Sequence, residues 1–171
     1  MKTINELTEK IGINHLNEMQ GTVVKAIQHT TDNIMVLSPT GSGKTLAYIL
    51  PLVCMVDTAS DDLQAIVIVP GRELALQSLN VLRSLGNDVR GYACYGGRPT
   101  MDEHRQLRQL KPHIIFATPG RMNDHIDKDN VDVDSVKWII IDEFDKCLEM
   151  GLHEEMSYLI NRLPFKARQI L

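Results

Sequence analysis

The chain has 171 residues, of which 43% are apolar and 23% are charged, values typical of an ordinary globular domain. Its 18 basic and 22 acidic residues give a formal net charge of −4, which argues against a protein that binds nucleic acid mainly through bulk positive charge. The three cysteines, Cys54, Cys94 and Cys147, lie far apart and form no CxxC pair. Neither a disulfide framework nor a zinc ribbon is therefore expected.

No segment of the sequence predicts export or membrane insertion. The first ten residues mix charges and lack the apolar stretch of a secretory signal. The longest apolar run, residues 46–56, is about half of the ~20 residues that a membrane-spanning helix needs. We expect a monomeric cytoplasmic protein that does not bind membranes.

Short β-branched runs alternate along the chain with amphipathic stretches. Two short helices are expected first, at residues 3–10 and 15–28. Strands are then expected at residues 34–37, 66–69, 90–95, 114–117, 138–141 and 169–171, and helices at residues 44–56, 72–85, 101–110, 120–126 and 153–163. This alternation predicts one α/β domain over residues 1–171, with a parallel sheet flanked by helices on both faces.

The first predicted strand leads into a glycine-rich loop, SPTGSGKT at residues 38–45, and a helix follows it. This is the context of a phosphate-binding P-loop, because glycines let backbone N–H groups turn inward and the helix N-terminus adds partial positive charge. Lys44 is expected to contact the β- and γ-phosphates, and the Thr45 hydroxyl to ligate Mg²⁺. The predicted nucleotide-binding residues of the loop are Thr40, Gly41, Ser42, Gly43, Lys44 and Thr45. The alternative is a glycine-rich turn before a helix that binds nothing.

Two carboxylates, Asp142 and Glu143, follow the apolar run at residues 138–141. A P-loop needs a carboxylate at the end of a neighbouring strand to hold Mg²⁺, and Asp142 is expected to do so together with Thr45. Glu143 is placed to orient or deprotonate the water that attacks the γ-phosphate. The catalytic residues predicted from this pattern are Lys44, Asp142 and Glu143. The alternative makes the two carboxylates a favourable charge pair at a helix N-terminus.

Six motifs in this order resemble those of DEAD-box RNA helicases. They are Gly12-Ile13 with Gln20, SPTGSGKT at 38–45, PGRELA at 70–75, Gly96-Gly97, TPGR at 118–121 and DEFD at 142–145. The resemblance covers nearly the whole chain and implies the first of the family's two RecA-like domains, a P-loop NTPase fold with residues 1–30 as the Q-motif region. It also implies that the second RecA-like domain, absent from this chain, is a partner within the same protein.

The resemblance further implies ATP and Mg²⁺ as cofactors and RNA as the partner. Gln20 resembles the glutamine that contacts adenine, whose N6 and N7 atoms match the donor and acceptor of an amide. The segments at Gly71, Arg72, Gly97, Thr118 and Arg121 resemble those that contact RNA, and their backbone N–H groups suit phosphates rather than bases. The complete protein is expected to hydrolyse ATP with RNA bound and to separate short duplexes, whereas the isolated domain, without the arginine fingers of the second domain, is expected to be nearly inactive.

Three positions depart from the family pattern. Phe144 replaces alanine, Gly71 replaces threonine, and Leu16 replaces proline. A structural ion pair remains an alternative role for Arg72 and for Arg121. At the level of function, a non-enzymatic, nucleotide-gated RNA clamp or scaffold remains the alternative to a helicase, while a DNA helicase or another P-loop ATPase is disfavoured by the Gln20 and PGREL/TPGR motifs.

Overall fold

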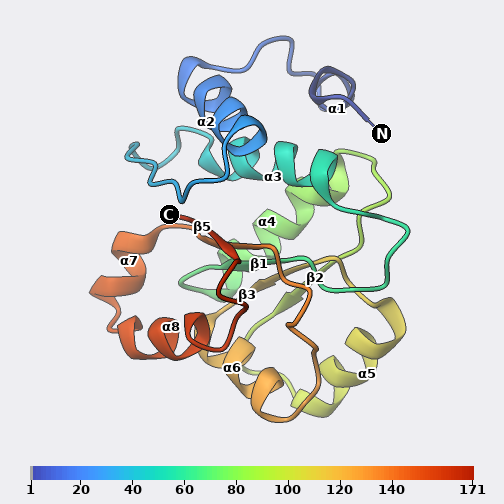
Figure 1. Cartoon of the computed structure of the whole chain (residues 1–171), viewed down its shortest axis with the longest axis vertical. Coiled ribbons are helices and arrows are strands. Elements are labelled where there is room, and N and C mark those ends of the chain that lie inside the picture. The colour runs from blue at the N-terminus through green and yellow to red at the C-terminus, as the bar shows by residue number, and fades with distance from the viewer. Residues whose placement is uncertain (1) are drawn as a thin grey trace.

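The computed structural model describes residues 2–171 and contains a parallel sheet between two layers of helices (Figure 1). The strands, in chain order, are β1 (Ala65–Ile68), β2 (Gly91–Cys94), β3 (Ile114–Ala117), β4 (Trp138–Ile141) and β5 (Arg168–Ile170). Their order across the sheet is β2-β3-β1-β4-β5, and every neighbouring pair is parallel. The predicted α/β architecture with a parallel sheet is confirmed.

Eight helices accompany the strands. They are α1 (Ile4–Lys10), α2 (Glu18–His29), α3 (Lys44–Met55), α4 (Arg72–Ser84), α5 (Thr100–Leu110), α6 (Pro119–Asp127), α7 (Phe144–Glu149) and α8 (His153–Ile160). Among residues 2–171, none of these helices has both the length and the apolar character that crossing a membrane requires.

The alternation of side chains along each strand divides the core into two clusters. In β1, Ala65 and Val67 pack into a cluster with α1 to α4, whereas Ile66 and Ile68 pack into a second cluster with α5 to α8. All four residues of β1 are buried, as expected for a central strand covered on both faces. The sheet is thus covered by the first four helices on one face and the last four on the other.

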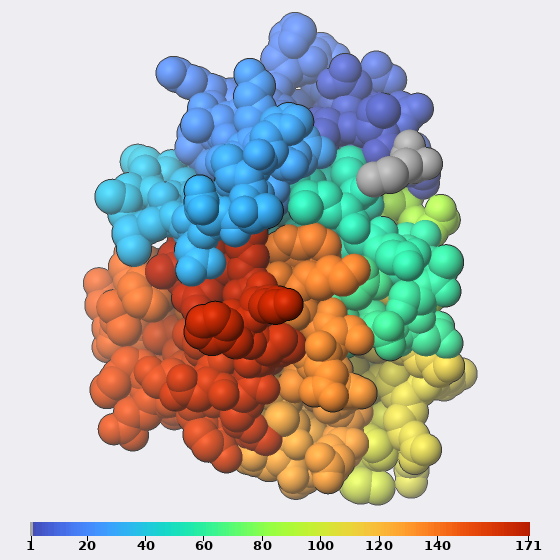
Figure 2. Space-filling model, in the orientation of Figure 1, coloured from blue at the N-terminus to red at the C-terminus, as the bar shows by residue number. Residues whose placement is uncertain are grey.

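The strand predicted at residues 34–37 is wrong as a regular strand, because only an isolated bridge, Ile34 to Ile170, is present there. Within residues 2–171, this segment hydrogen-bonds only to residues at the end of β5 and just after it; the Ile34 N–H, for example, donates to the carbonyl oxygen of Gln169 at 2.9 Å. Met35 and Leu37 are 63% and 89% exposed. The apolar pattern predicts a strand, but residues 34–37 have a neighbouring strand on one side only within the described chain. In Figure 2 this light-blue segment lies against the red C-terminal residues.

Two other expectations differ from the structure. Residues 144–149 form a short helix, α7, which the sequence pattern did not predict. Helix α8 ends at Ile160 rather than at residue 163, because residues 161–163 form a turn before Pro164. The remaining predicted strands and helices agree with the structure to within two or three residues at each end.

The parallel strands bring their carboxyl ends to one edge of the sheet. The segments that begin at Pro70, Tyr95, Thr118 and Asp142 follow β1, β2, β3 and β4, so they all lie along this edge. The strand order places the first three of these segments on one half of the edge. Asp142 lies on the other half, together with the loop that follows Ile34.

Candidate functional site

The glycine-rich loop is closed by contacts among its own residues. Gly41 and Gly43 have φ angles of 82° and 87°, which favour glycine, and α3 begins at the next residue, Lys44. The Lys44 ammonium donates hydrogen bonds to the carbonyl oxygens of Ser38 at 2.6 Å and Pro39 at 3.2 Å. The sequence therefore folds into a loop that turns sharply into a helix N-terminus with no side-chain cap, the arrangement that leaves backbone N–H groups free for an anion.

The carboxylate of Asp142 meets the first turn of α3. Its Oδ2 atom accepts hydrogen bonds from the Thr45 hydroxyl at 3.2 Å and from the Tyr48 hydroxyl at 2.9 Å. Asp142 is only 6% exposed, and this burial raises its pKa above the ordinary value, although the hydrogen bonds from Tyr48 and Thr45 act in the opposite direction. Burial and the nearby Asp142 also raise the pKa of Tyr48 well above its ordinary value.

Tyr48 is a residue of this site that the sequence analysis missed. It lies three positions after Thr45, so both hydroxyls project from the same face of α3. A tyrosine in an apolar helix is usually core filling, and only the partnership with Asp142, 94 positions away, reveals its second role. The i, i+3 spacing from Thr45 was the one available signal.

Glu143 occupies a constrained position next to Asp142. Its φ of 52° and ψ of 50° lie in the left-handed region, which is uncommon for residues other than glycine. Glu143 is the N-cap residue of α7, although its side chain makes no capping hydrogen bond. Its carboxylate forms an ion pair of 2.7 Å with Lys146, one turn later. Phe144, where the family pattern has alanine, is half-buried against the second core cluster. The two adjacent carboxylates thus have different partners: Asp142 contacts α3, whereas Glu143 pairs with Lys146.

A cavity of about 400 Å³ lies between the glycine-rich loop and the end of β4. Lys44, Tyr48, Asp142 and Glu143 contribute polar groups to its lining, and Phe144 adds an apolar wall. This volume is within the range typical of small-molecule sites.

Two side chains at the start of α2 donate hydrogen bonds to the backbone of the glycine-rich loop. The Asn17 side chain donates to Ser42 O at 3.0 Å, and the Gln20 amide nitrogen donates to Gly43 O at 3.2 Å. The Gln20 carbonyl oxygen accepts from the backbone N–H of Asn17 at 3.0 Å, which completes a capping box at the start of α2. Gln20 is 8% exposed, so these contacts hold it buried at the start of α2 rather than exposed on the helix surface.

The five residues expected to face RNA lie after the ends of three adjacent strands. Gly71 is the N-cap of α4 after β1, Gly97 follows β2, and Thr118 is the N-cap of α6 after β3. The Thr118 hydroxyl caps no backbone group of α6, while Pro119 does occupy the first turn. Both helix starts therefore carry backbone N–H groups without side-chain partners.

The two arginines of this set differ. Arg72 is exposed and forms no ion pair within residues 2–171. The Arg121 side chain is only 10% exposed and pairs with Glu103 and Asp124, both at 3.4 Å. The ion-pair alternative therefore holds for Arg121 and not for Arg72.

Comparisons with known proteins agree with this geometry. A family model described as DEAD/DEAH box helicase matches residues 17–171. Curated relatives include the ATP-dependent RNA helicase CshA of Limosilactobacillus reuteri, 42% identical over 136 residues, which cover 77% of this chain and 27% of that protein. The DEAD-box ATP-dependent RNA helicase CshA of Bacillus cereus is 38% identical over 161 residues, which cover 91% of this chain and 30% of that protein. The chain spans less than a third of the length of these relatives.

Solved structures give the same answer for the fold. The crystal structure of a DEAD box protein from Methanococcus jannaschii superposes with a TM-score of 0.93 at 28% identity, over 100% of this chain and 47% of that chain. A hypothetical ATP-dependent RNA helicase from Sulfolobus tokodaii superposes with a TM-score of 0.87 at 28% identity, over 98% of this chain and 49% of that chain. The resemblance inferred from the six motifs is confirmed, and the RecA-like fold with it. The chain belongs to the DEAD/DEAH box helicase family.

Proposed function

We propose that this chain is the ATP-binding domain of an ATP-dependent RNA helicase, which couples the binding and hydrolysis of ATP to RNA binding and local unwinding of duplexes. One observation carries the proposal: the loop ending in Lys44-Thr45 meets Asp142, with Thr45 Oγ1 3.2 Å from Asp142 Oδ2. The matched curated relatives are named as ATP-dependent RNA helicases. Because the chain spans less than a third of their length, the activity belongs to a longer protein.

The residues around Asp142 fit a magnesium ion bound with ATP. The Thr45 hydroxyl and the Asp142 carboxylate are hard oxygen donors, the ligand type that Mg²⁺ prefers. The buried carboxylate is also destabilised as an anion, which its raised pKa reflects, and a divalent cation relieves that cost. When bound, the ion neutralises charge on the phosphate oxygens. Thr45 and Asp142 would hold the ion, and Lys44, which now donates to the Ser38 and Pro39 carbonyls, would donate to the phosphates instead.

Glu143 is the residue that we assign to the attacking water. It follows Asp142 directly and lines the same cavity. In the described structure its carboxylate is paired with Lys146 at 2.7 Å, so it must leave that partner, or share it, to accept a proton from water. Gln20, held between Asn17 and Gly43, keeps one amide hydrogen and one carbonyl lone pair for the adenine edge.

We assign RNA to the other half of the carboxyl edge, along Gly71, Arg72, Gly97 and Thr118. The free backbone N–H groups at the starts of α4 and α6 suit phosphate oxygens, and Arg72 adds an exposed guanidinium. Such contacts carry no base information, so the binding is independent of RNA sequence. In the proposal the protein acts as a cytoplasmic monomer, and a second RecA-like domain completes the site, so the isolated chain hydrolyses ATP very slowly.

One observation favours the alternative of a nucleotide-gated RNA clamp that does not hydrolyse ATP. It is the ion pair between Glu143 and Lys146, which occupies the proposed water-orienting carboxylate. Multiple turnovers of ATP by the complete protein with single-stranded RNA would exclude the clamp.

Comparison of RNA with DNA in the same assay tests the choice of nucleic acid, because the 2′-hydroxyl is the main local difference.

The nucleotide part of the proposal is tested by binding of Mg·ATP and Mg·GTP to Gln20→Ala, with Gln28→Ala, an exposed position on the same helix, as the control. We expect the parent chain and Gln28→Ala to prefer ATP by roughly ten- to hundredfold and Gln20→Ala to lose that preference. An unchanged preference in Gln20→Ala would remove its adenine role. Absence of ATP binding at millimolar concentration in the folded parent chain would overturn the function itself.

A further inference from the structure

The Arg121 guanidinium holds the loop that contains the glycine pair at both of its ends. Its Nε atom donates to the carbonyl oxygen of Tyr95 at 3.2 Å, and its Nη2 atom donates to the carbonyl oxygen of Arg98. These two carbonyls flank Gly96 and Gly97, both of which are exposed. A single, mostly buried side chain from α6 therefore hydrogen-bonds to both ends of a surface loop that follows β2.

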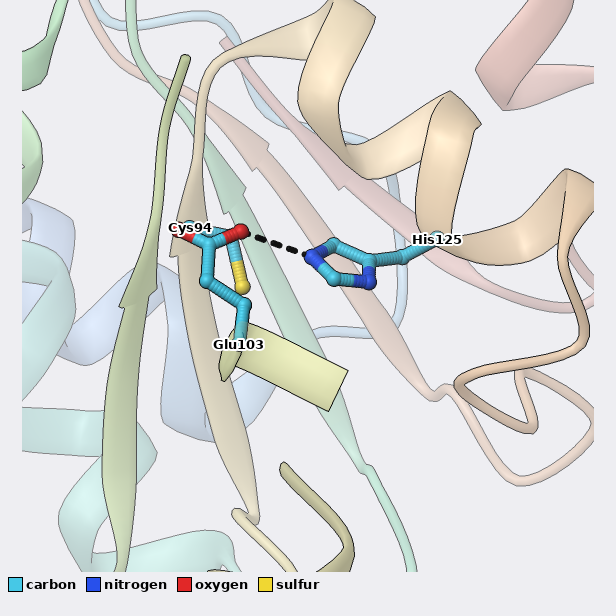
Figure 3. A group of neighbouring side chains, drawn as sticks. All are labelled: Cys94, Glu103 and His125. Atoms are coloured by element: carbon cyan, nitrogen blue, oxygen red, sulfur yellow. Dashed lines mark hydrogen bonds and ion pairs between the residues drawn. The ribbon is translucent and has the colours of Figure 1, made fainter. Parts of the chain in front are cut away.

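Arg121 is in turn oriented by Glu103, a residue on α5 that belongs to neither the nucleotide site nor the RNA surface of the proposed function. Glu103 Oε2 lies 3.4 Å from Arg121 Nε and 2.8 Å from His125 Nε2. Glu103 Oε1 accepts from the backbone N–H of Tyr95 at 3.4 Å. Figure 3 shows the carboxylate directed at the His125 ring, with the Cys94 sulfur beside it. Glu103 is 1% exposed and His125 is fully buried.

The same cluster could be taken for a metal site, since ligand atoms of Cys94, Glu103 and His125 all lie within 4.8 Å of one another. Three contacts argue against it. Both Glu103 oxygens already accept hydrogen bonds, and His125 Nδ1 is bonded to the Asn130 amide at 3.1 Å. Burial raises the pKa of the Cys94 thiol, which opposes the thiolate that a metal needs, and the Arg121 charge repels a cation.

The contacts instead describe a closed hydrogen-bond network. Both ring nitrogens of His125 have partners, because Nε2 lies 2.8 Å from Glu103 Oε2 and Nδ1 lies 3.1 Å from the Asn130 amide nitrogen. Thr100 Oγ1 accepts from Arg121 Nη1 at 2.6 Å and donates to Asp124 at 3.1 Å. The network joins the end of β2 to the first turns of α5 and α6, the elements that carry two of the three proposed RNA-contacting segments.

We propose that Glu103 is a positioning residue for RNA binding, which acts through Arg121 to hold the Gly96-Gly97 loop and the start of α6 in the geometry that phosphates require. The inference rests on the RNA surface of the proposed function. It concerns the half of the sheet edge that follows β2 and β3, and not the half that carries Lys44 and Asp142. Loss of the network should therefore weaken RNA binding and leave nucleotide binding unchanged.

The direction in which RNA affinity changes when Glu103 is replaced distinguishes a positioning role from a purely electrostatic one. Removal of a negative charge close to a phosphate-binding surface normally strengthens the binding of RNA. A positioning role predicts weaker RNA binding when Glu103 is replaced, because Arg121 then loses the partner that orients it towards the carbonyl groups of the loop. Asp102 is the matched control, since it is an exposed carboxylate on the adjacent position of α5 and its only ion pair within residues 2–171 is to Arg105 at 3.9 Å.

The test is a fluorescence-anisotropy titration of the 171-residue chain with a labelled single-stranded oligouridine at low salt, run beside a Mg·ATP titration. We expect Glu103→Ala to weaken RNA binding about tenfold, as for the loss of one hydrogen bond to a charged phosphate, and to leave ATP affinity within twofold. Glu103→Gln should restore most of the affinity, because its carbonyl oxygen can accept from both Arg121 and His125. Asp102→Ala should bind RNA at least as tightly as the parent.

A second variant keeps the test valid if Glu103→Ala does not fold. Thr100→Val preserves shape but removes one acceptor of Arg121, and it should weaken RNA binding about threefold. Arg72→Ala, outside the network, tests the RNA surface itself. Weaker binding in Arg72→Ala with unchanged binding in Glu103→Ala or, where that variant does not fold, in Thr100→Val would overturn the positioning role alone. Absence of RNA binding by the parent chain would overturn the proposal that this surface binds RNA, and this inference with it.

Discussion

Replacement of Asp142 by asparagine should stabilise the chain and abolish its response to Mg·ATP. Asp142 is buried at 6% exposure, and its pKa is raised above 3.8, chiefly by burial. An acid whose folded pKa is raised contributes stability that is complete below its unfolded pKa and is lost as the pH rises through its folded pKa. At pH 7 the ionised, buried carboxylate therefore lowers the free energy of unfolding of the parent, whereas the uncharged amide of asparagine does not.

The magnitude follows from the linkage between pKa and stability. Each unit by which the folded pKa is raised costs about 1.4 kcal/mol once the carboxylate is ionised. An asparagine oxygen in the place of Oδ2 can still accept the hydrogen bonds of Thr45 and Tyr48, so the two side-chain hydrogen bonds to this position are kept. We expect Asp142→Asn to gain on the order of 1 kcal/mol at pH 7, or about 2–4 °C in Tm.

The assay is thermal unfolding across pH 4.5–8, with and without Mg·ATP, and Glu149→Gln, at an exposed carboxylate of α7 that does not line the cavity, serves as the control. The difference between Asp142→Asn and the parent should grow as the pH rises and shrink towards pH 4.5. Mg·ATP at about a hundred times its Kd should stabilise the parent and the control by about 2.7 kcal/mol but not Asp142→Asn. A destabilised Asp142→Asn, or a difference that does not change with pH, would refute the reasoning.

Three further substitutions give stability changes that unfolding experiments can measure. Tyr48→Phe removes a hydrogen bond to the buried carboxylate of Asp142 and should cost about 2 kcal/mol, or about 4–8 °C in Tm, so an unchanged Tm would contradict the contact. Gly43→Ala should cost about 2 kcal/mol or more and weaken ATP binding, because its Cβ would lie 2.3 Å from the Gln20 amide nitrogen at a φ of 87°. Arg168→Leu should cost about 3 kcal/mol, since the buried guanidinium donates four hydrogen bonds at or near the end of α2, and a loss below 1 kcal/mol would count against this.

A glycine on α2 provides the control for Gly43→Ala. No atom lies within 4 Å of a Cβ built at Gly21, and its φ is not positive. Gly21→Ala should therefore stabilise the helix by roughly 0.8–1 kcal/mol. Opposite signs for the two glycine substitutions would show that the cost at Gly43 comes from its conformation and from Gln20.

The central strands and the two long helices that follow the loop and β1 were predictable, because their patterns are strong. The run WIII at β4 is apolar on consecutive positions and is buried on both faces, as that pattern implies. Residues 34–37 carry a similar pattern but pair on one side only within the described chain, and periodicity does not report which neighbours a segment has. Helix α7 is short and follows a sharp turn at Glu143, which propensities do not anticipate.

Local motifs predicted the glycine-rich loop and its carboxylate partner, whereas two buried residues that contact the predicted site residues were missed. The loop at 38–45 and the pair Asp142-Glu143 were identified from local motifs. The hydrogen bond from Tyr48 to Asp142 and the network of Glu103 with Arg121 join positions that are far apart in sequence. Apart from the i, i+3 spacing of Tyr48 from Thr45, no local pattern marks such partners, because a buried tyrosine or glutamate acquires its role from the residues that the fold brings next to it.

Calorimetric titration of the folded chain with ATP, in the presence and in the absence of Mg²⁺, tests the central claim most directly. The claim is that Lys44, Thr45 and Asp142 form one site for a triphosphate and its magnesium ion. The account predicts saturable binding that requires Mg²⁺ for full affinity and that is lost in Lys44→Ala. Equal heats for the parent and Lys44→Ala, or no heat from millimolar Mg·ATP, would contradict it.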